Sequence, residues 1–312
     1  MKKKNLHHSR RMFLQYAGTA MVLPFWGGIK LEAKDLSVAK DSLKILTCNI
    51  RVDLEDDAKK GVGWSDRREA CLHIIKQRDA DVIGFQEVLK NQFLDLKENL
   101  KEYWGIGFDG PEMDRYRTGY HGIAKNPLFF KKKRFELLAA GGYWLSETPL
   151  VAGSISWGSA RARNASWVRL LDKSTGKECR IINLHLDHVN KEAKRKQIEV
   201  VLEESAQYPP DFPQILVGDF NASAETPVVQ SVFKYDWKDS YTEINGDGEP
   251  GYTVHLFKGD KYEKKDIGKK IDFIFTKGEQ IKSIASSIIR DAYKDRYPSD
   301  HYFVEATLTI SR

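Results

Sequence analysis

Residues 214–221 read Gln-Ile-Leu-Val-Gly-Asp-Phe-Asn, an apolar run that ends at an acid and an amide. The run 215–217 predicts a buried strand, and side chains two residues apart on an extended chain point the same way. Asp219 and Asn221 are therefore expected to share one face at the end of this strand. A carboxylate in that place can orient or deprotonate a water, and an amide can donate to a developing oxyanion. The alternative is an Asx turn that closes the strand.

Polar side chains stand at the ends of several other predicted strands. Predicted helices over residues 66–78, 91–100 and 191–205 lie between these strands, and the alternation favours a layered α/β core. No low-complexity segment, repeat or linker interrupts residues 43–312, so a single domain is expected there. Strand ends near solvent can bring their side chains together at one cleft. The polar strand ends are Asn49, Glu87, the set Asn183, His185 and Asp187, and the pair Asp219 and Asn221.

Asp272 is an acid among large apolar residues in the predicted strand 271–276. Burying a carboxylate there costs free energy unless a partner compensates its charge. His301, which follows Asp300 just before the last apolar strand, is the partner that we expect. Such a pair would raise the pKa of the histidine and hold it charged for a phosphate. A purely structural ion pair is the alternative.

Glu87 offers a hard oxygen ligand of the kind that Mg²⁺ or Mn²⁺ takes in proteins. Cys48, Cys71 and Cys179 show neither a CxxC motif nor zinc-like spacing, and we expect them to be buried thiols. The sequence therefore favours a hard-cation site over a structural zinc.

The formal net charge of +6 comes almost entirely from the beginning of the chain. Residues 1–33 hold six basic residues and one acid, and without them the totals of 50 and 44 fall to 44 basic and 43 acidic residues. Global charge therefore says nothing about a polyanionic partner.

The same segment, residues 1–33, resembles a twin-arginine export signal. Ser9-Arg10-Arg11-Met12-Phe13 precedes an apolar stretch, 16–28, that is too short to span a bilayer, since a spanning helix needs about 20 residues. An exposed basic N-terminus before a buried helix is the alternative. We predict an exported chain, periplasmic or tethered to the membrane by an uncleaved signal, with a linker over 34–42. No stable membrane span is expected in the mature chain, and a monomer is expected.

Six motifs, taken in their order along the chain, resemble the endonuclease/exonuclease/phosphatase superfamily. That superfamily includes deoxyribonucleases, abasic-site endonucleases, deadenylase domains, bacterial sphingomyelinases and inositol polyphosphate phosphatases. The resemblance covers about residues 43–310 and implies a DNase-I-like four-layer α/β-β/α sandwich, with two mixed β-sheets packed face to face and helices outside. The motifs are Thr47-Cys48-Asn49-Ile50-Arg51, Gln86-Glu87-Val88, Asn183-Leu184-His185-Leu186-Asp187-His188, Gly218-Asp219-Phe220-Asn221, Ile271-Asp272-Phe273-Ile274-Phe275 and Ser299-Asp300-His301.

The resemblance implies a metal-dependent attack of water on phosphorus. Glu87 and Asn49 would hold the metal, Mg²⁺ or Mn²⁺, with Asp300 as a ligand or beside one. Asp219 would activate the attacking water, and Asn221 would position that water and the phosphate.

The resemblance also implies the contacts to the phosphate. His301, paired with Asp272, would donate to a non-bridging oxygen, while His185 and Asn183 would bind the phosphate from the opposite side. Family members often carry a Glu or Tyr near position 126, where this chain has Asn126, as deadenylase-like members do.

Further substrate contacts are expected from two loops. Arg163 lies in the predicted long loop 148–163, together with Trp157 and Arg161, and aromatics interleaved with arginines can stack bases and hold phosphates. His255, in the segment 251–257, resembles a family loop near the cleft. Covering the edge of the core is the alternative for both loops.

Three functions fit these residues. The favoured one is a phosphodiesterase or nuclease acting on nucleic acid, with a deadenylase-like 3′–5′ exonuclease included. The second is a hydrolase of phospholipid headgroups or inositol phosphates. The third is a ligand-binding module that keeps the fold without catalysis, which the loss of the water-activating Asp or of a metal ligand would support.

Overall fold

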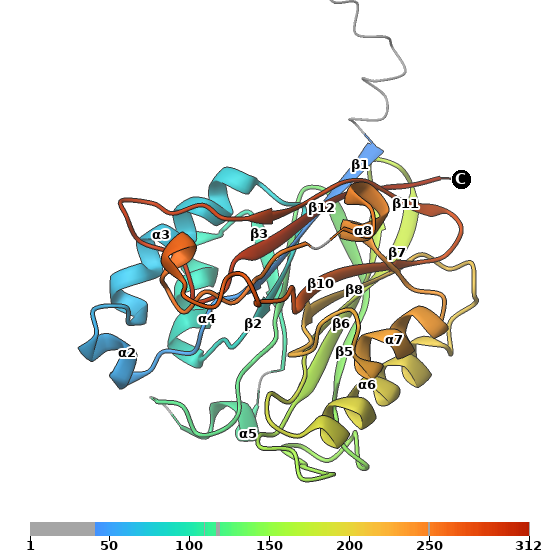
Figure 1. Cartoon of the computed structure of the whole chain (residues 1–312). Coiled ribbons are helices and arrows are strands. Elements are labelled where there is room, and N and C mark those ends of the chain that lie inside the picture. The colour runs from blue at the N-terminus through green and yellow to red at the C-terminus, as the bar shows by residue number, and fades with distance from the viewer. Residues whose placement is uncertain (1–40, 109, 117–118, 249, 312) are drawn as a thin grey trace, which may run out of the picture.

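The computed structural model of the chain describes residues 41–108, 110–116, 119–248 and 250–311 (Figure 1). The predicted export signal and most of the predicted linker lie outside the described residues. The first strand begins at Ser42, one residue before the predicted start of the domain. Within the described ranges, no helix is both long enough and apolar enough to cross a membrane.

Two six-stranded sheets form the centre of the molecule (Figure 1). The strand order is β11-β12-β1-β2-β4-β3 in the first sheet and β5-β6-β7-β8-β10-β9 in the second. Both sheets are mixed, because β1 and β2 pair in parallel in one and β7 and β8 pair in parallel in the other. The strands are β1 (Ser42–Asn49), β2 (Val82–Gln86), β3 (Tyr103–Ile106), β4 (Leu128–Lys131), β5 (Phe135–Trp144), β6 (Asn164–Asp172), β7 (Lys177–His185), β8 (Gln214–Asp219), β9 (Lys238–Asp239), β10 (Asp272–Lys277), β11 (Ile281–Ile289) and β12 (Phe303–Ile310).

Helices cover the outer face of each sheet (Figure 1). On the first sheet, α3 (Trp64–Arg78) and α4 (Lys90–Asn99) bury apolar side chains such as Ile74 and Phe93 against strands β1 and β2. On the second sheet, α6 (Lys191–Ser205) and α7 (Pro227–Lys234) do the same against β7 and β8. The remaining helices are short: α2 (Glu55–Lys59), α5 (Pro111–Asp114), α8 (Ser240–Asn245) and a 3₁₀ turn at Gly259–Lys261.

The inner faces of the two sheets share one apolar core. Val82 and Val304 of the first sheet pack in the same buried cluster as Ile181, Val217 and Ile274 of the second. The result is the predicted four-layer sandwich of helices, sheet, sheet and helices. The predicted helices begin and end within two residues of α3, α4 and α6, and Cys48, Cys71 and Cys179 are buried free thiols, as predicted.

The strand pairing brings the polar strand ends together. Parallel pairing places the ends of β1 and β2 side by side, with Asn49 beside Gln86, and places His185 beside Asp219. The antiparallel strand β10 starts at the same end, with Asp272 opposite Asp219. These polar side chains therefore lie where the two sheets meet at one end of the sandwich.

Gly218 precedes Asp219 in β8 and adopts φ 145°, a conformation that L-residues rarely take. A Cβ at this position would lie 2.1 Å from the carbonyl oxygen of Leu184, on the neighbouring strand β7. We expect Gly218→Ala to destabilise the fold by more than about 3 kcal/mol, because backbone strain and overpacking add. Equilibrium unfolding in urea measures the difference.

Gly176 is the matched control for this substitution. Its φ is 70°, and a Cβ there would meet no atom within 4 Å. Gly176→Ala should cost only the backbone strain, about 1 kcal/mol. Equal losses for the two variants would contradict the close approach of β7 to Gly218.

Candidate active site

A cavity of about 330 Å³ opens at the end of the sandwich where the polar strand ends meet. Seven of the predicted site residues line it: Glu87, Arg163, His185, Asp219, Asn221, Asp300 and His301. The other lining residues are Arg51, Val52, Leu54, Tyr120, Ala124, Arg161, His188 and Val254.

Asn49 links the two carboxylates at the floor of the cavity. Its Nδ2 donates to Glu87 Oε1 at 3.2 Å and to Asp219 Oδ2 at 2.9 Å. Its Oδ1 accepts from the backbone N–H of Arg51 at 3.0 Å. In this arrangement Asn49 holds the acids in place, and its own oxygen is already engaged, so its role as a metal ligand stays a prediction.

Three residues at this end of the sheets have left-handed backbones. Arg51, Glu87 and Asn221 have φ of 58°, 62° and 46°, although none is glycine. Each follows the end of a strand, where the chain turns sharply beside the cavity. Such conformations cost about 1–3 kcal/mol each and cluster at functional sites, where surrounding contacts hold them in place.

His301 and Asp272 form a buried ion pair beside Asp219. His301 Nδ1 lies 3.0 Å from Asp272 Oδ2, and its Nε2 lies 3.9 Å from Asp219 Oδ2. Burial alone would lower the pKa of His301, but Asp272, with Asp219 and Asp300, raises that pKa well above its usual value. The raised pKa favours the imidazolium predicted from the sequence, and its Nε2 side faces Asp219.

The two carboxylates of the cavity differ in their electrostatics. Burial, followed by the nearby Asp272, raises the pKa of Asp219 above its usual value. For Glu87, burial would also raise the pKa, but the Val52 N–H bond at 3.0 Å and the charges of His301 and Arg51 lower it. Glu87 is therefore held ionised, whereas Asp219 is suited to take up a proton.

The donor set fits a hard divalent cation. Ligand atoms of Glu87, His185 and Asp219 lie within 4.8 Å of one another, as do those of Asp219, Asp272 and His301. The first group combines two carboxylates with an imidazole, and the ionised carboxylate of Glu87 is the chemistry that Mg²⁺ or Mn²⁺ prefers. Glu87 would hold the cation, with Asp219 close enough to share it.

Asp300 lines the cavity but is already engaged. Its Oδ2 lies 3.5 Å from Arg51 NH1, and its Oδ1 accepts from Ser299 Oγ at 3.2 Å. Arg51 in turn donates from Nε to Asp57 at 2.8 Å. Asp300 therefore stands beside the acid cluster, and its ligand role stays a prediction.

Asn183 does not lie at the cavity, contrary to the sequence prediction. It is fully buried, and its Nδ2 donates to the carbonyl oxygens of Phe85 and Pro127 at 2.8 and 3.0 Å. Its Oδ1 accepts from Gln86 Nε2 at 2.6 Å. Asn183 thus joins the two sheets, and no polar atom of it is left for a phosphate.

Asn126 and His255 are also placed away from the cavity lining. Asn126 is buried and donates to the backbone oxygen of Asn164 at 2.9 Å. His255 is fully buried, stacks on Tyr302 with ring centroids 4.0 Å apart, and accepts from the Gly259 N–H at Nδ1. The backbone N–H of His255 donates to the carbonyl of Asp300 at 2.8 Å, so this loop supports the Asp300–His301 segment instead of contacting a substrate.

Sequence reasoning did not single out His188 and Tyr120, which both line the cavity. His188 lies beyond the end of β7, three residues after His185, where alternation no longer applies. Tyr120 reaches the cavity from the connection before β4, a segment without a recognisable motif. Only the second histidine of the run 185–188 was a usable signal.

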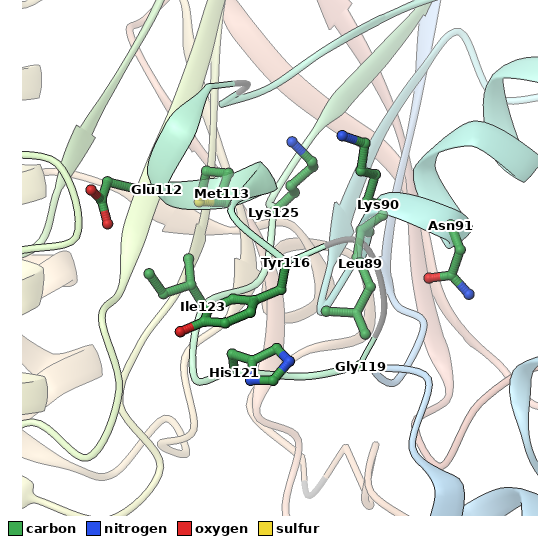
Figure 2. A pocket seen from close by; sticks show the side chains of 11 residues that line it. Leu89, Lys90, Asn91, Glu112, Met113, Tyr116, Gly119, His121, Ile123 and Lys125 are labelled. Atoms are coloured by element: carbon green, nitrogen blue, oxygen red, sulfur yellow. The ribbon is translucent and has the colours of Figure 1, made fainter.

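A second, smaller pocket lies on the other side of the segment 119–125 (Figure 2). Tyr120 and Ala124 of that segment line the large cavity, whereas His121, Ile123 and Lys125 line this one. Figure 2 shows the side chains of Tyr116 and His121 next to each other in its lining, and their stacked rings have centroids 3.7 Å apart. Its volume of about 30 Å³ holds a water or two, so the pocket is too small for a substrate.

Comparison with known proteins agrees with this geometry. A model of the endonuclease/exonuclease/phosphatase family matches residues 46–301. An endonuclease/exonuclease/phosphatase from Bacteroides vulgatus is 30% identical to this chain. The match covers 86% of this chain and 99% of the Bacteroides vulgatus chain, with a TM-score of 0.76. A mannosyl-6-phosphatase from Bacteroides thetaiotaomicron is 28% identical, with coverage of 86% and 100% and a TM-score of 0.76.

Nocturnin from Drosophila melanogaster is a more partial relative. It is 26% identical over 190 residues, which are 57% of this chain but only 27% of Nocturnin. The family match spans both sheets and every motif from Asn49 to His301, and the DNase-I-like fold is common to the compared structures. The chain therefore belongs to the endonuclease/exonuclease/phosphatase family, whose members are hydrolases of phosphoesters.

Proposed function

We propose that this chain hydrolyses phosphoesters by in-line attack of a water on phosphorus, with a bound divalent cation. The observation that carries the proposal is the convergence of Asp219, His301, His185 and Asn221 in one cavity beside the ionised Glu87. A ligand-binding module without catalysis is less well supported, because both the water-activating Asp and the predicted metal-binding Glu are present and side by side.

Asp219 is the group suited to orient and deprotonate the water. Its Oδ1 accepts from the backbone N–H of Asn221 at 2.8 Å and its Oδ2 from Asn49, so the carboxylate is fixed in direction. A general base held in this way contributes about 10²–10⁴ in rate.

His301 and Asn221 supply donors for the negative charge that grows on the phosphate oxygens, and the nearby positive charge of Arg163 adds to their effect. His301 is held charged by Asp272, and Arg163 is always a cation. Donors that are fixed before the reaction stabilise the transition state without reorganisation. When bound, Mg²⁺ or Mn²⁺ would polarise the phosphoryl group as a Lewis acid.

Removal of the metal should abolish activity and lower stability together. We expect EDTA to stop hydrolysis and Mg²⁺ to restore it, while Mg²⁺ at 100 times its Kd adds about 2.7 kcal/mol to the free energy of unfolding. Glu87→Gln should weaken Mg²⁺ binding by about 10–100-fold or more. Calorimetric titration and thermal unfolding measure both effects.

Glu263→Gln is the control for the metal experiment, since Glu263 is an exposed acid paired with Lys258. This variant should respond to Mg²⁺ like the wild type. A thermal shift by Mg²⁺ that survives Glu87→Gln would place the metal elsewhere.

Two substrate classes are supported by different observations. Nucleic-acid phosphodiesters are supported by the rim of the cavity, where Arg161 lies 5.8 Å from the ring of Tyr120 and could stack a base with it. Small phosphorylated sugars or polyols are supported by the cavity volume of about 330 Å³ and by the similarity to a mannosyl-6-phosphatase over 86% of this chain. Lipid headgroups have weaker support, from the apolar side chains Leu150, Val151 and Ile155 that the loop before β6 exposes.

A substrate panel separates these classes. The full chain would be assayed with Mg²⁺, Mn²⁺ or EDTA on RNA, DNA, bis-p-nitrophenyl phosphate, mannose 6-phosphate, inositol phosphates and sphingomyelin. Metal-dependent turnover of at least one ester supports the proposal, and the preferred ester names the class. No turnover of any of them, with a correctly folded chain, would contradict it. Export remains part of the proposal, and cell fractionation of the full chain tests it.

A further inference from the structure

Arg163 is a buried cation whose side-chain partners are neutral. It is 8% exposed, and its two terminal nitrogens lie 3.1 Å from the Nδ1 atoms of His185 and His188. Its Nε is buried, and no partner for it occurs within the described ranges. Across those ranges, no carboxylate oxygen pairs with this guanidinium either.

These contacts decide which ring nitrogen of each histidine carries the proton. A guanidinium has five donors and no acceptor, and it keeps its charge in proteins. Nδ1 of His185 and Nδ1 of His188 must therefore accept, which leaves the proton of each neutral ring on Nε2. Burial and then the charge of Arg163 lower the pKa of both histidines, which is consistent with neutral rings.

The Asn221 amide has to follow this assignment. Its Nδ2 is placed 2.9 Å from His185 Nε2 and 3.2 Å from the Leu186 carbonyl. The Nε2–H of His185 would then face the N–H of Asn221, so two donors would meet. For both ring nitrogens to accept instead, the ring would have to be an imidazolate. A half-turn of the Asn221 amide exchanges its oxygen and its nitrogen, so this contact can be corrected. The guanidinium of Arg163 has no acceptor, so no rotation of it can change the contacts with Nδ1. Asn221 should therefore present Oδ1 to His185, which frees Nδ2 for a phosphate oxygen at the cost of the Leu186 contact.

We propose that Arg163 is a positioning residue that fixes His185 and His188 as their Nε2–H tautomers, and that His188 is a further substrate-binding residue whose Nε2–H donates to a phosphate oxygen. His188 lines the cavity beside Arg161 and Arg163, and its residue is exposed. Its Nδ1 lies against Arg163, so Nε2 points away from Arg163. The phosphate contact rests on the proposed function, whereas the tautomers do not.

Nitrogen NMR tests the tautomers without any assay of activity. The metal-free chain labelled with ¹⁵N-histidine would be measured at pH 8, with His185 and His188 assigned by their Gln variants. We expect both rings to show the Nε2–H pattern in the wild type and His188 to become a mixture of tautomers in Arg163→Met. Arg161→Met is the control, since Arg161 donates to the Ala160 carbonyl, and should change neither ring. An Nδ1–H pattern for either ring in the wild type would overturn the assignment, even if Arg163→Met failed to fold.

Binding of inorganic phosphate tests the role of His188. Titrated phosphate should shift the His188 Nε2 resonance of the wild type. His188→Asn should weaken phosphate binding about tenfold or more, the usual effect of losing a hydrogen bond to a charged group. His188→Gln places an amide nitrogen where Nε2 of the histidine lies, so it keeps a hydrogen-bond donor. Its affinity for phosphate should therefore stay within about threefold of the wild-type affinity.

The outcomes separate this inference from the proposed function. Unchanged phosphate affinity in His188→Asn would overturn the role of His188, whether or not the chain hydrolyses an ester. A wild type that binds phosphate through His188 but turns over no ester would leave this inference standing and contradict the proposed function.

Discussion

Asp219→Ala is expected to lower kcat by about 10²–10⁴-fold, the range for loss of a positioned general base. Asp219 is the carboxylate on which the site converges, with Asn49 and the Asn221 backbone donating to it and His301 Nε2 3.9 Å away. Of the other two carboxylates that line the cavity, Glu87 has a lowered pKa and Asp300 is paired with Arg51. Steady-state kinetics with the preferred ester of the panel measures the change.

The same substitution should leave the fold intact. Burial raises the pKa of Asp219, so its charged form is less favourable in the folded chain than in the unfolded one, and its removal relieves that cost. Asp172→Ala is the matched control. Asp172 is a buried acid outside the cavity lining, and its Oδ2 lies 2.7 Å from a terminal nitrogen of Arg134. That variant should lose stability and keep its kcat. Near-wild-type turnover by Asp219→Ala would remove Asp219 from the mechanism.

His301→Ala is expected to lower kcat by about 10²–10³-fold, the usual loss for one well-placed donor to a developing oxyanion. Unlike Asp219→Ala, it should also lower stability by about 3–5 kcal/mol, because Asp272 is left as a buried charge without a partner. His301 Nδ1 is 3.0 Å from Asp272, and both residues are buried. Thermal unfolding and kinetics on the same preparations separate the two losses.

The double variant Asp272→Asn/His301→Ala distinguishes the catalytic role of His301 from its contribution to stability. The double variant removes both charges, so it should regain most of the lost stability while its kcat stays at the level of His301→Ala. Arg180→Ala, which breaks the partly buried ion pair with Glu204 of α6, is the control and should lose stability alone, because neither residue lines the cavity. Recovery of kcat in the double variant would mean that His301 contributes to turnover only by stabilising the folded structure.

The residue types at the strand ends predict the chemistry that is proposed for the site. The polar residues beside apolar strands could be interpreted before their partners were known, because burying a polar group without a partner has a large free-energy cost. They are Asp219 and Asn221 after one apolar strand, Glu87 after another, and Asp272 among apolar residues, with His301 as its expected partner. The α/β alternation likewise predicted the layers, and the order of the motifs predicted the family. Each of these inferences depends on local sequence alone.

The position of a residue along its strand could not be predicted in the same way. Asn183 and His185 lie two residues apart in β7 and share a face, yet Asn183 joins the sheets and His185 borders the cavity. The difference is where β2 of the opposite sheet ends: Gln86, its last residue, still bonds to Asn183, whereas His185 lies level with Glu87, where the cavity begins. Sequence alternation predicts the face of a side chain but not the depth at which another sheet covers it.

Contacts between distant segments were likewise settled only by the tertiary structure. Arg163 meets His185 and His188 across the pairing of β6 with β7, and Tyr120 reaches the cavity from a connection with no motif. His255, expected at the substrate, is turned inward onto Tyr302 instead. The sequence determined which chemical groups the chain carries at its strand ends, and the packing of the two sheets decided which of them meet. The physical reason is that residue chemistry and strand alternation are local properties, whereas burial depends on atoms that other segments of the chain contribute.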